Sequence, residues 1–368
     1  NKNSNIELLR IVSMFIIVLH HLVLYSNIDI VKDYGLNIYF YNLFMVGGKL
    51  GANCFFTISS YYLLQQNSKN NYKSKILKTH NVLWFYSILF LIVNMIFRIK
   101  IIEIIDILES IMPLVYNSYW FISSYILLLI FCPIFNIVIE KLDENKYKKI
   151  LLILFIIITI NAFVPKANIL NDPQHFIVTI CIYFLVGFIN RFKNNKLDQQ
   201  KLKLVLCSSL SFIIFSSFAM LFIGNKLNMN ILIMNSHIMM SGESIFIISA
   251  AVSLFYLFLN KKRFTNGIIN QMGNSTFDVY LIHMNHLIYM WIWNDLFKIK
   301  ILFKSQMFPI YAIIIASTVF IITDFIGILR NIMFIYVKKI YNVVMKGRNK
   351  YYEKNKTIFD CRDRSKLL

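Results

Sequence analysis

The chain has 368 residues, of which 58% are hydrophobic and only 15% are charged, and its mean hydropathy is +0.61. This composition excludes a soluble globular protein, which needs more polar surface, and is typical of a polytopic membrane protein. The formal net charge of +20 would suggest nucleic-acid binding in a soluble chain. Here the lysines lie in short loops and in the C-terminal segment, so we expect no nucleic-acid partner.

Ten apolar runs are long enough to cross a bilayer as helices. In chain order they cover residues 6–26, 41–64, 80–97, 119–139, 150–164, 174–190, 204–223, 241–259, 276–297 and 309–329. We therefore expect an all-α bundle of about ten transmembrane helices surrounded by the lipid bilayer. The first run lacks a small-x-small cleavage pattern, so we expect it to be a retained span. Residues 1–345 are predicted to form one membrane domain, and residues 346–368 a basic, disordered cytosolic tail.

The distribution of lysine and arginine predicts the orientation of the bundle. With the N-terminus in the cytosol, the cytosolic segments hold 27 of these residues and the external loops hold 8. Without the C-terminal tail the ratio is still 17 to 8. Because positively charged loops stay inside, both termini are predicted to be cytosolic.

The first span carries Arg10 near its cytosolic end and the pair His20-His21 deep inside. Arg10 and His21 are eleven residues apart, so they share one helix face with a rise of about 16 Å. Ionisable groups inside a bilayer usually line a site or a pathway. Snorkelling to lipid phosphate would also explain Arg10, and a bond to a neighbouring helix would explain His21. His20 lies about 100° around the helix, so we expect only one ring to face a common cavity.

Imidazole and guanidinium groups suit two different parts of one reaction. An imidazole suits proton exchange with an attacking hydroxyl, and an arginine at the cytosolic mouth suits the phosphates of an anionic donor. A proton-coupled transporter could use the same pair. The five cysteines have no metal-binding spacing, so we expect no metal site.

The second span combines small residues with a pair of phenylalanines and is followed by a basic segment. Its motif reads Gly47-Gly48-Lys49-Leu50-Gly51-Ala52-Asn53-Cys54-Phe55-Phe56-Thr57-Ile58-Ser59-Ser60. Glycines in a span permit close helix packing. The following Lys75 and Lys78 are ordinary signals of an inside loop, but they share a membrane face with Arg10, where a nucleotide phosphate could bind.

Two further stretches carry more polar or aromatic side chains than lipid-facing helices need. Tyr119-Trp120 begins a span on the external side, where an interfacial aromatic belt explains it. Sugar rings also stack on such side chains, which leaves an acceptor role open. The span after residue 275 holds a polar set predicted to face an internal cavity. This set is Asp278, Tyr280, His283, Asn285 and His286. Glu243 and Asp324 are isolated acids, each either a site residue or an interhelical partner.

Together these stretches resemble the integral-membrane acyltransferase 3 family, in particular its stand-alone branch associated with O-acetylation of capsular and exopolysaccharides in Gram-positive bacteria. The Arg10-to-His21 spacing resembles the first-helix motif of the family and selects His21 over His20. Three further matches follow in chain order. The first is Gly51 with Phe55-Phe56 and Ser59, which resembles the second-helix pattern FF-x-x-S-G except that Ser60 replaces its glycine. The second is Trp120-Phe121, and the third is Tyr280-Leu-Ile-His283. Lys75 and Lys78 stand where the family often has arginines.

The resemblance implies transfer of an acyl group, usually acetyl, from cytosolic acetyl-CoA to a hydroxyl of a cell-surface or lipid-linked saccharide at a bacterial plasma membrane. It implies that Arg10, Lys75 and Lys78 bind the donor phosphates. His21 is then the general base or a transient acyl carrier. The remaining roles are orientation of the acceptor or oxyanion stabilisation by His283 and Tyr280, and substrate binding by Trp120 and Asp278.

The rival interpretation is a polytopic transporter or a flippase of lipid-linked oligosaccharide. Such proteins often contain paired repeats and spans broken by Gly or Pro in matching halves. The sequence has no internal repeat, and none of its five prolines lies centrally in a pair of spans. A membrane scaffold without chemistry would leave His21, His283 and Asp278 unexplained.

Overall fold

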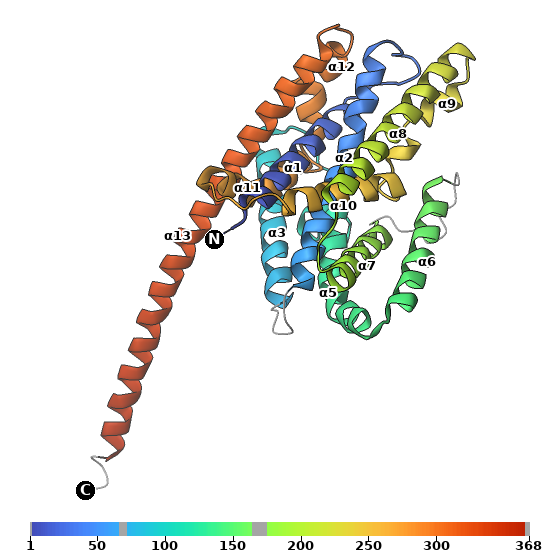
Figure 1. Ribbon diagram of the computed structural model, residues 1–368. Helices are drawn as coiled ribbons and strands as arrows, with labels where there is room; N and C mark the ends of the chain where they lie inside the picture. The colour runs from blue at the N-terminus through green and yellow to red at the C-terminus, as the bar shows by residue number, and fades with distance from the viewer. Residues whose placement is uncertain (1, 66–71, 164–174, 365–368) are drawn as a thin grey trace.

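The computed structural model of the protein describes residues 2–65, 72–163 and 175–364. Within these residues all regular structure is helical, which confirms the predicted all-α class (Figure 1). Ten helices in the described part of the chain have 15 residues or more. They are α1 (Ser4–Leu24), α2 (Asn37–Leu64), α3 (Tyr72–Phe97), α5 (Trp120–Lys141), α6 (Glu144–Phe163), α7 (Phe176–Lys193), α8 (Gln199–Lys226), α10 (Ile245–Leu259), α11 (Gly267–His283) and α13 (Phe308–Arg364).

Seven of the long helical segments also have the length and hydropathy of a membrane span. The protein is thus a multi-pass membrane protein. The short elements lie in the connections on the side predicted to be external. They are α4 (Ile104–Ile111), α9 (Asn230–Met234), the 3-10 helix η1 (Ile238–Met240), the π-helix η2 (Trp291–Leu296) and α12 (Ile299–Leu302).

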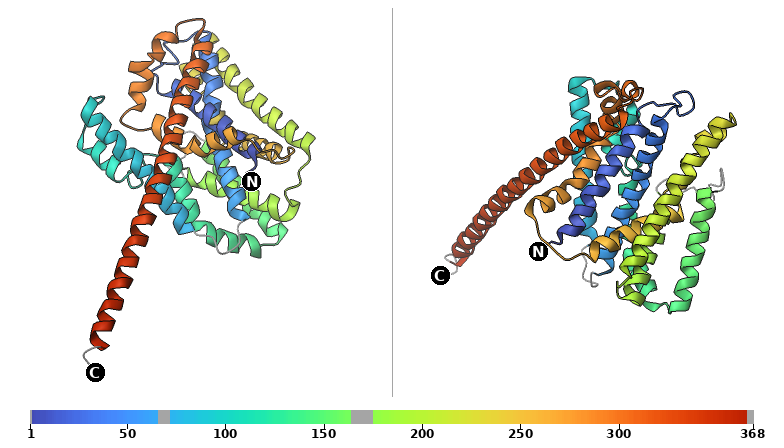
Figure 2. Two further views of the ribbon diagram at one scale, coloured as in Figure 1. Left: turned by 90° about the vertical axis from the view of Figure 1, so that its left-hand side faces the viewer. Right: turned by 45° about the horizontal axis from the view of Figure 1, so that its top comes forward.

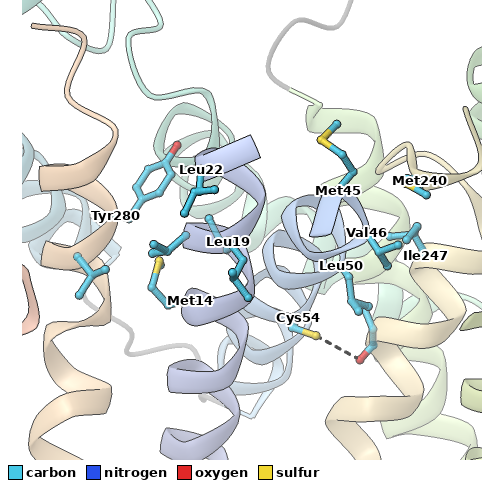
Figure 3. Close-up of a cluster of buried hydrophobic side chains, with 14 of the residues drawn as sticks. Met14, Leu19, Leu22, Met45, Val46, Leu50, Cys54, Met240, Ile247 and Tyr280 are labelled. Atoms are coloured by element: carbon cyan, nitrogen blue, oxygen red, sulfur yellow. Dashed lines mark hydrogen bonds between the residues drawn. The ribbon is translucent and has the colours of Figure 1, made fainter. Parts of the chain in front are cut away.

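Helices α1 and α2 pack closely at the centre of the bundle, where glycines of α2 leave no room for a side chain. A Cβ on Gly51 would lie 2.6 Å from the Ser13 carbonyl oxygen, and one on Gly48 would overlap the His20 ring. The predicted role of these glycines in helix packing is therefore confirmed. Figure 3 shows apolar side chains filling the space around this contact, including Leu19 from α1 and Leu50 from α2.

Helix α11 is shorter at its C-terminal end than the predicted span 276–297. It begins after Asn266, whose side chain accepts a hydrogen bond from the Ile269 N–H, and it ends at His283. The Asn285 side chain then accepts from the Leu287 N–H at 3.0 Å. This local bond turns the chain although the sequence stays apolar beyond it, which is why hydropathy alone overran the boundary.

Helix α13 packs along α1 and α11 and then continues well beyond the bundle (Figures 1 and 2). The segment 346–368, predicted as a disordered tail, falls within this helix up to Arg364, and residues 365–368 lie outside the described residues. The division of the chain at residue 345 stays a prediction.

Candidate active site

A cavity of about 1480 Å³ is lined by side chains from both ends of the bundle. Its predicted cytosolic end is lined by basic residues of α1 and α3, such as Arg10 and Lys75. Its other end is lined by Trp120, the first residue of α5. Seven of the eight site residues predicted from the sequence line it. These are Arg10, His21, Lys75, Lys78, Trp120, Asp278 and Tyr280. The eighth, His283, lies directly behind His21.

The predicted cytosolic end of the cavity is positively charged. Arg10 forms an ion pair with the buried Glu7 at 3.4 Å, and Lys2 lies 3.6 Å from the same carboxylate. Glu7 neutralises one of these two cations, and Lys75 and Lys78 from the first turns of α3 border the same space. Because Arg10 faces this cavity, a role in binding an anionic ligand fits its position better than snorkelling to lipid.

His21 and His283 form a buried pair of imidazoles at mid-cavity. His21 Nδ1 lies 2.9 Å from His283 Nε2, and the ring centroids are 5.1 Å apart. On its other side, His283 Nδ1 lies 2.6 Å from the Val279 carbonyl oxygen, one turn earlier in α11. The His283 ring is thus fixed at both nitrogens.

The backbone carbonyl determines which nitrogens of this pair carry protons. A carbonyl oxygen only accepts, so His283 Nδ1 must donate to Val279, and in the neutral ring His283 Nε2 then has a lone pair. His21 Nδ1–H donates to that lone pair. The remaining nitrogen of His21, Nε2, is left without a proton on a ring that borders the cavity. This arrangement gives a base or nucleophile of defined orientation.

Contrary to prediction, His20 also borders the cavity. The expectation that only one of the two histidines would face it is wrong, because the two rings lie edge to face with centroids 5.2 Å apart and both reach the same cavity. His20 Nδ1 is engaged with the Met45 carbonyl oxygen at 3.0 Å, and the ring packs on Gly48. His20 therefore joins α1 to α2, whereas the chain of hydrogen bonds that ends at the Val279 carbonyl oxygen begins at His21.

Tyr280 lines the same cavity. The side chain is buried, and its hydroxyl donates no hydrogen bond to any described residue. Its ring centroid lies 6.2 Å from that of His283. An unpartnered buried hydroxyl at the edge of a cavity is costly unless a ligand or water completes it. Tyr280 is thus available as a donor to a bound group.

Asp278 lines the cavity, but its carboxylate is already occupied. Arg330 of α13 donates from Nε to Oδ1 at 2.5 Å and from Nη2 to Oδ2 at 3.1 Å, and the Tyr86 hydroxyl donates to Oδ1 at 2.8 Å. The bidentate pair of Arg330 and Asp278 joins α13 to α11, and the bond from Tyr86 joins α3 to both. Its geometry fits a structural role better than direct contact with a substrate.

Comparison with known families assigns the class of the protein. The sequence model of the acyltransferase 3 family, described as an acyltransferase domain, matches residues 3–327. The chain belongs to this family. The match covers every predicted site residue, while Arg330 lies just beyond it. No curated protein and no solved structure matches the chain.

In this acyltransferase the structure also adds cavity residues that the sequence did not assign, namely Lys49, His175 and Arg330. Lys49 had a usable signal, because a lysine inside an apolar span is a functional candidate by default. His175 lies at the edge of the predicted span 174–190, so it carried a weaker form of the same signal, and in the structure it directly precedes α7. Of the two isolated acids, Glu243 approaches His175, and Asp324 accepts a hydrogen bond from Ser275.

One group of potential metal ligands lies outside the cavity of the acyltransferase. Atoms of Asp106, Glu109 and His286 lie within 4.8 Å of one another. However, Asp106 accepts from Lys100 at 2.7 Å and from the Glu103 N–H at 3.0 Å. Burial raises the pKa of Asp106, but these bonds and the Lys100 charge outweigh it and lower the pKa below its ordinary value. The carboxylate is thus engaged as a helix cap and ion pair.

Proposed function

We propose that this membrane acyltransferase moves an acyl group, acetyl in the simplest case, from cytosolic acyl-CoA to a hydroxyl of a cell-surface or lipid-linked saccharide at a bacterial plasma membrane. The observation that carries the proposal is that one cavity is lined both by Arg10 at its basic end and by the ring of His21, which is hydrogen-bonded to His283. A donor entering from the predicted cytosolic side would meet Arg10, Lys75 and Lys78 with its phosphates.

In the proposed reaction His21 acts as general base. Its Nε2 accepts the proton of the acceptor hydroxyl as the oxygen attacks the thioester carbonyl carbon. The new C–O bond replaces the C–S bond, and His21 returns the proton to the departing thiolate sulfur. His283 keeps Nδ1 of His21 protonated and stabilises the imidazolium that forms transiently, which makes His283 a positioning residue.

The hydroxyl of Tyr280 supplies a donor for the oxygen that becomes negative during attack. It is buried, unpartnered among the described residues and carried by the same helix as His283. A donor that is already oriented costs no reorganisation when charge develops. Stabilisation of the oxyanion is therefore the role that we propose for Tyr280.

Transfer by the purified protein tests this function. The protein in nanodiscs is incubated with radiolabelled acetyl-CoA and capsule or exopolysaccharide fragments, and ester-linked label on the glycan is measured. We expect label on the glycan with wild-type protein and none with His21→Ala at equal protein level. Unchanged label with His21→Ala would remove His21 from the chemistry. Glycan flux across liposomes without label transfer would instead support the transporter.

A further inference from the structure

A second cluster of ionisable groups lies at the external end of the cavity. Lys49 Nζ lies 2.9 Å from His175 Nε2 and 3.9 Å from the centroid of the Trp120 ring. On the far side of the imidazole, His175 Nδ1 lies 3.6 Å from Glu243 Oε1. Lys49, Trp120 and His175 all line the cavity that contains His21.

The side chain of Lys49 is directed toward the external side of the bundle. Trp120 is the first residue of α5, and His175 immediately precedes α7. The aliphatic part of Lys49 packs on Gly242 in the connection before α10, where an added Cβ would lie 3.2 Å from Lys49 Cδ. These contacts hold the ammonium at the opposite end of the cavity from Arg10.

The ammonium keeps hydrogen-bonding capacity in this position. It has three N–H donors and no acceptor. One donor points to His175 Nε2 and the charge rests on the face of Trp120, so at least one N–H is unassigned. Within the described part of the chain no carboxylate lies within 4 Å of Lys49 Nζ, and Glu243 is held across the imidazole. A buried cation with a spare donor in a cavity suits a negatively charged oxygen.

We propose that Lys49, held by Trp120 and His175, binds an anionic oxygen group of the acceptor, either a sugar carboxylate or a phosphate oxygen next to the acylated saccharide. This inference rests on the proposed function and narrows its acceptor to acidic or phosphate-linked saccharides. In the proposed function the donor phosphates meet Arg10, Lys75 and Lys78 at the other end of the cavity, so Lys49 is not needed to bind them. Trp120 then holds the ammonium group of Lys49 over its indole ring. The face of the indole that Lys49 covers is therefore not available for stacking of a sugar.

Binding of small probes tests the proposal without any acyl transfer. Methyl β-glucuronide, glucose 1-phosphate and the neutral methyl glucoside are titrated by calorimetry into the protein in nanodiscs. The proteins are wild type, Lys49→Met and Lys32→Met. Lys32 is a matched control, since it is an external lysine whose side chain is 85% exposed. Thermal unfolding is measured for each variant to compare their folded states.

We expect at least one anionic probe to bind wild type and Lys32→Met about tenfold more tightly than methyl glucoside, and Lys49→Met to lose this preference. Preference for the glucuronide alone indicates an acidic sugar, and preference for the phosphate alone indicates a phosphate-linked one. Equal affinity for all three probes in wild type would overturn the inference, whether or not Lys49→Met folds. An anionic preference that persists in Lys49→Met would also overturn it.

The outcome is separable from that of the proposed function. If His21-dependent transfer is observed but the anionic preference is absent, only the assignment of Lys49 fails. If Lys49-dependent binding is observed but no label reaches any glycan, the transferase proposal fails while the anion site stands.

Discussion

Replacing His283 with leucine removes the hydrogen-bond acceptor of His21 while keeping a side chain of similar size. In the wild type His21 Nδ1 lies 2.9 Å from His283 Nε2, and both rings are buried. In His283→Leu the Nδ1–H group loses this partner, and the ring is free to rotate or to move its proton to Nε2. The base that the proposed reaction requires is then only partly populated.

The size of the effect follows from the environment of the bond. Leaving a buried donor unsatisfied costs about 1–3 kcal/mol. Each 1.36 kcal/mol of barrier corresponds to a tenfold change in rate, so kcat is expected to fall by about 5-fold to 160-fold. The KM values for both substrates should change little, because His283 faces His21 and does not line the cavity.

The assay measures kcat and KM for acetyl transfer in nanodiscs with His283→Leu and His283→Gln. Glutamine offers an amide oxygen where the imidazole offered Nε2, so it can accept from His21 Nδ1–H and should recover most of the lost kcat. Equal activity of His283→Leu and wild type, or an equal loss in both variants, would refute the positioning role.

Two further predictions concern the packing around the cavity. Arg330→Met leaves the Asp278 carboxylate buried without its cation, so thermal unfolding in detergent should report a loss of about 3–5 kcal/mol. The double variant with Asp278→Asn should recover part of that loss, and no recovery would argue against the pair. Gly48→Ala places a Cβ against the His20 ring and should cost about 1–3 kcal/mol in the same assay. Gly267→Ala, where the space is open, is the control and should be neutral.

The fold was largely predictable from hydropathy and charge. Each of the ten apolar runs overlaps one of the ten long helices of the described residues, because a chain segment in lipid must satisfy its own backbone hydrogen bonds. The end of α11 was missed because a single side chain sets it. Asn285 caps the turn through a local bond from the Leu287 N–H and donates to the Tyr119 hydroxyl in a tertiary contact, and a hydropathy profile contains neither bond.

The candidate site was predictable where one helix carries the signal. Arg10 and His21 share a face of α1, so helical periodicity alone placed them together. The pairing of His21 with His283 joins residues 262 positions apart and required the packing of α1 against α11. The engagement of Asp278 by Arg330 was likewise hidden, because an acid in a span has the same sequence signal whether it is free or paired.

The contact of Lys49 with His175 could not be predicted from the sequence for a different reason. His175 falls at the edge of the predicted span 174–190, but in the structure it precedes α7, so helical periodicity does not give the position of its side chain. Its neighbours in space come from α2, α5 and the segment before α10. Only the assembled bundle brings these elements to one end of the cavity.

A sided transfer assay tests most directly the claim that the cavity joins a cytosolic donor to an external acceptor through His21. Proteoliposomes carry radiolabelled acetyl-CoA inside, an impermeant glycan acceptor outside, and protein oriented with its N-terminus in the lumen. We predict label on the external glycan with wild-type protein and none with His21→Ala. Label that appears only when donor and acceptor share one side, or that is unchanged in His21→Ala, would contradict the account.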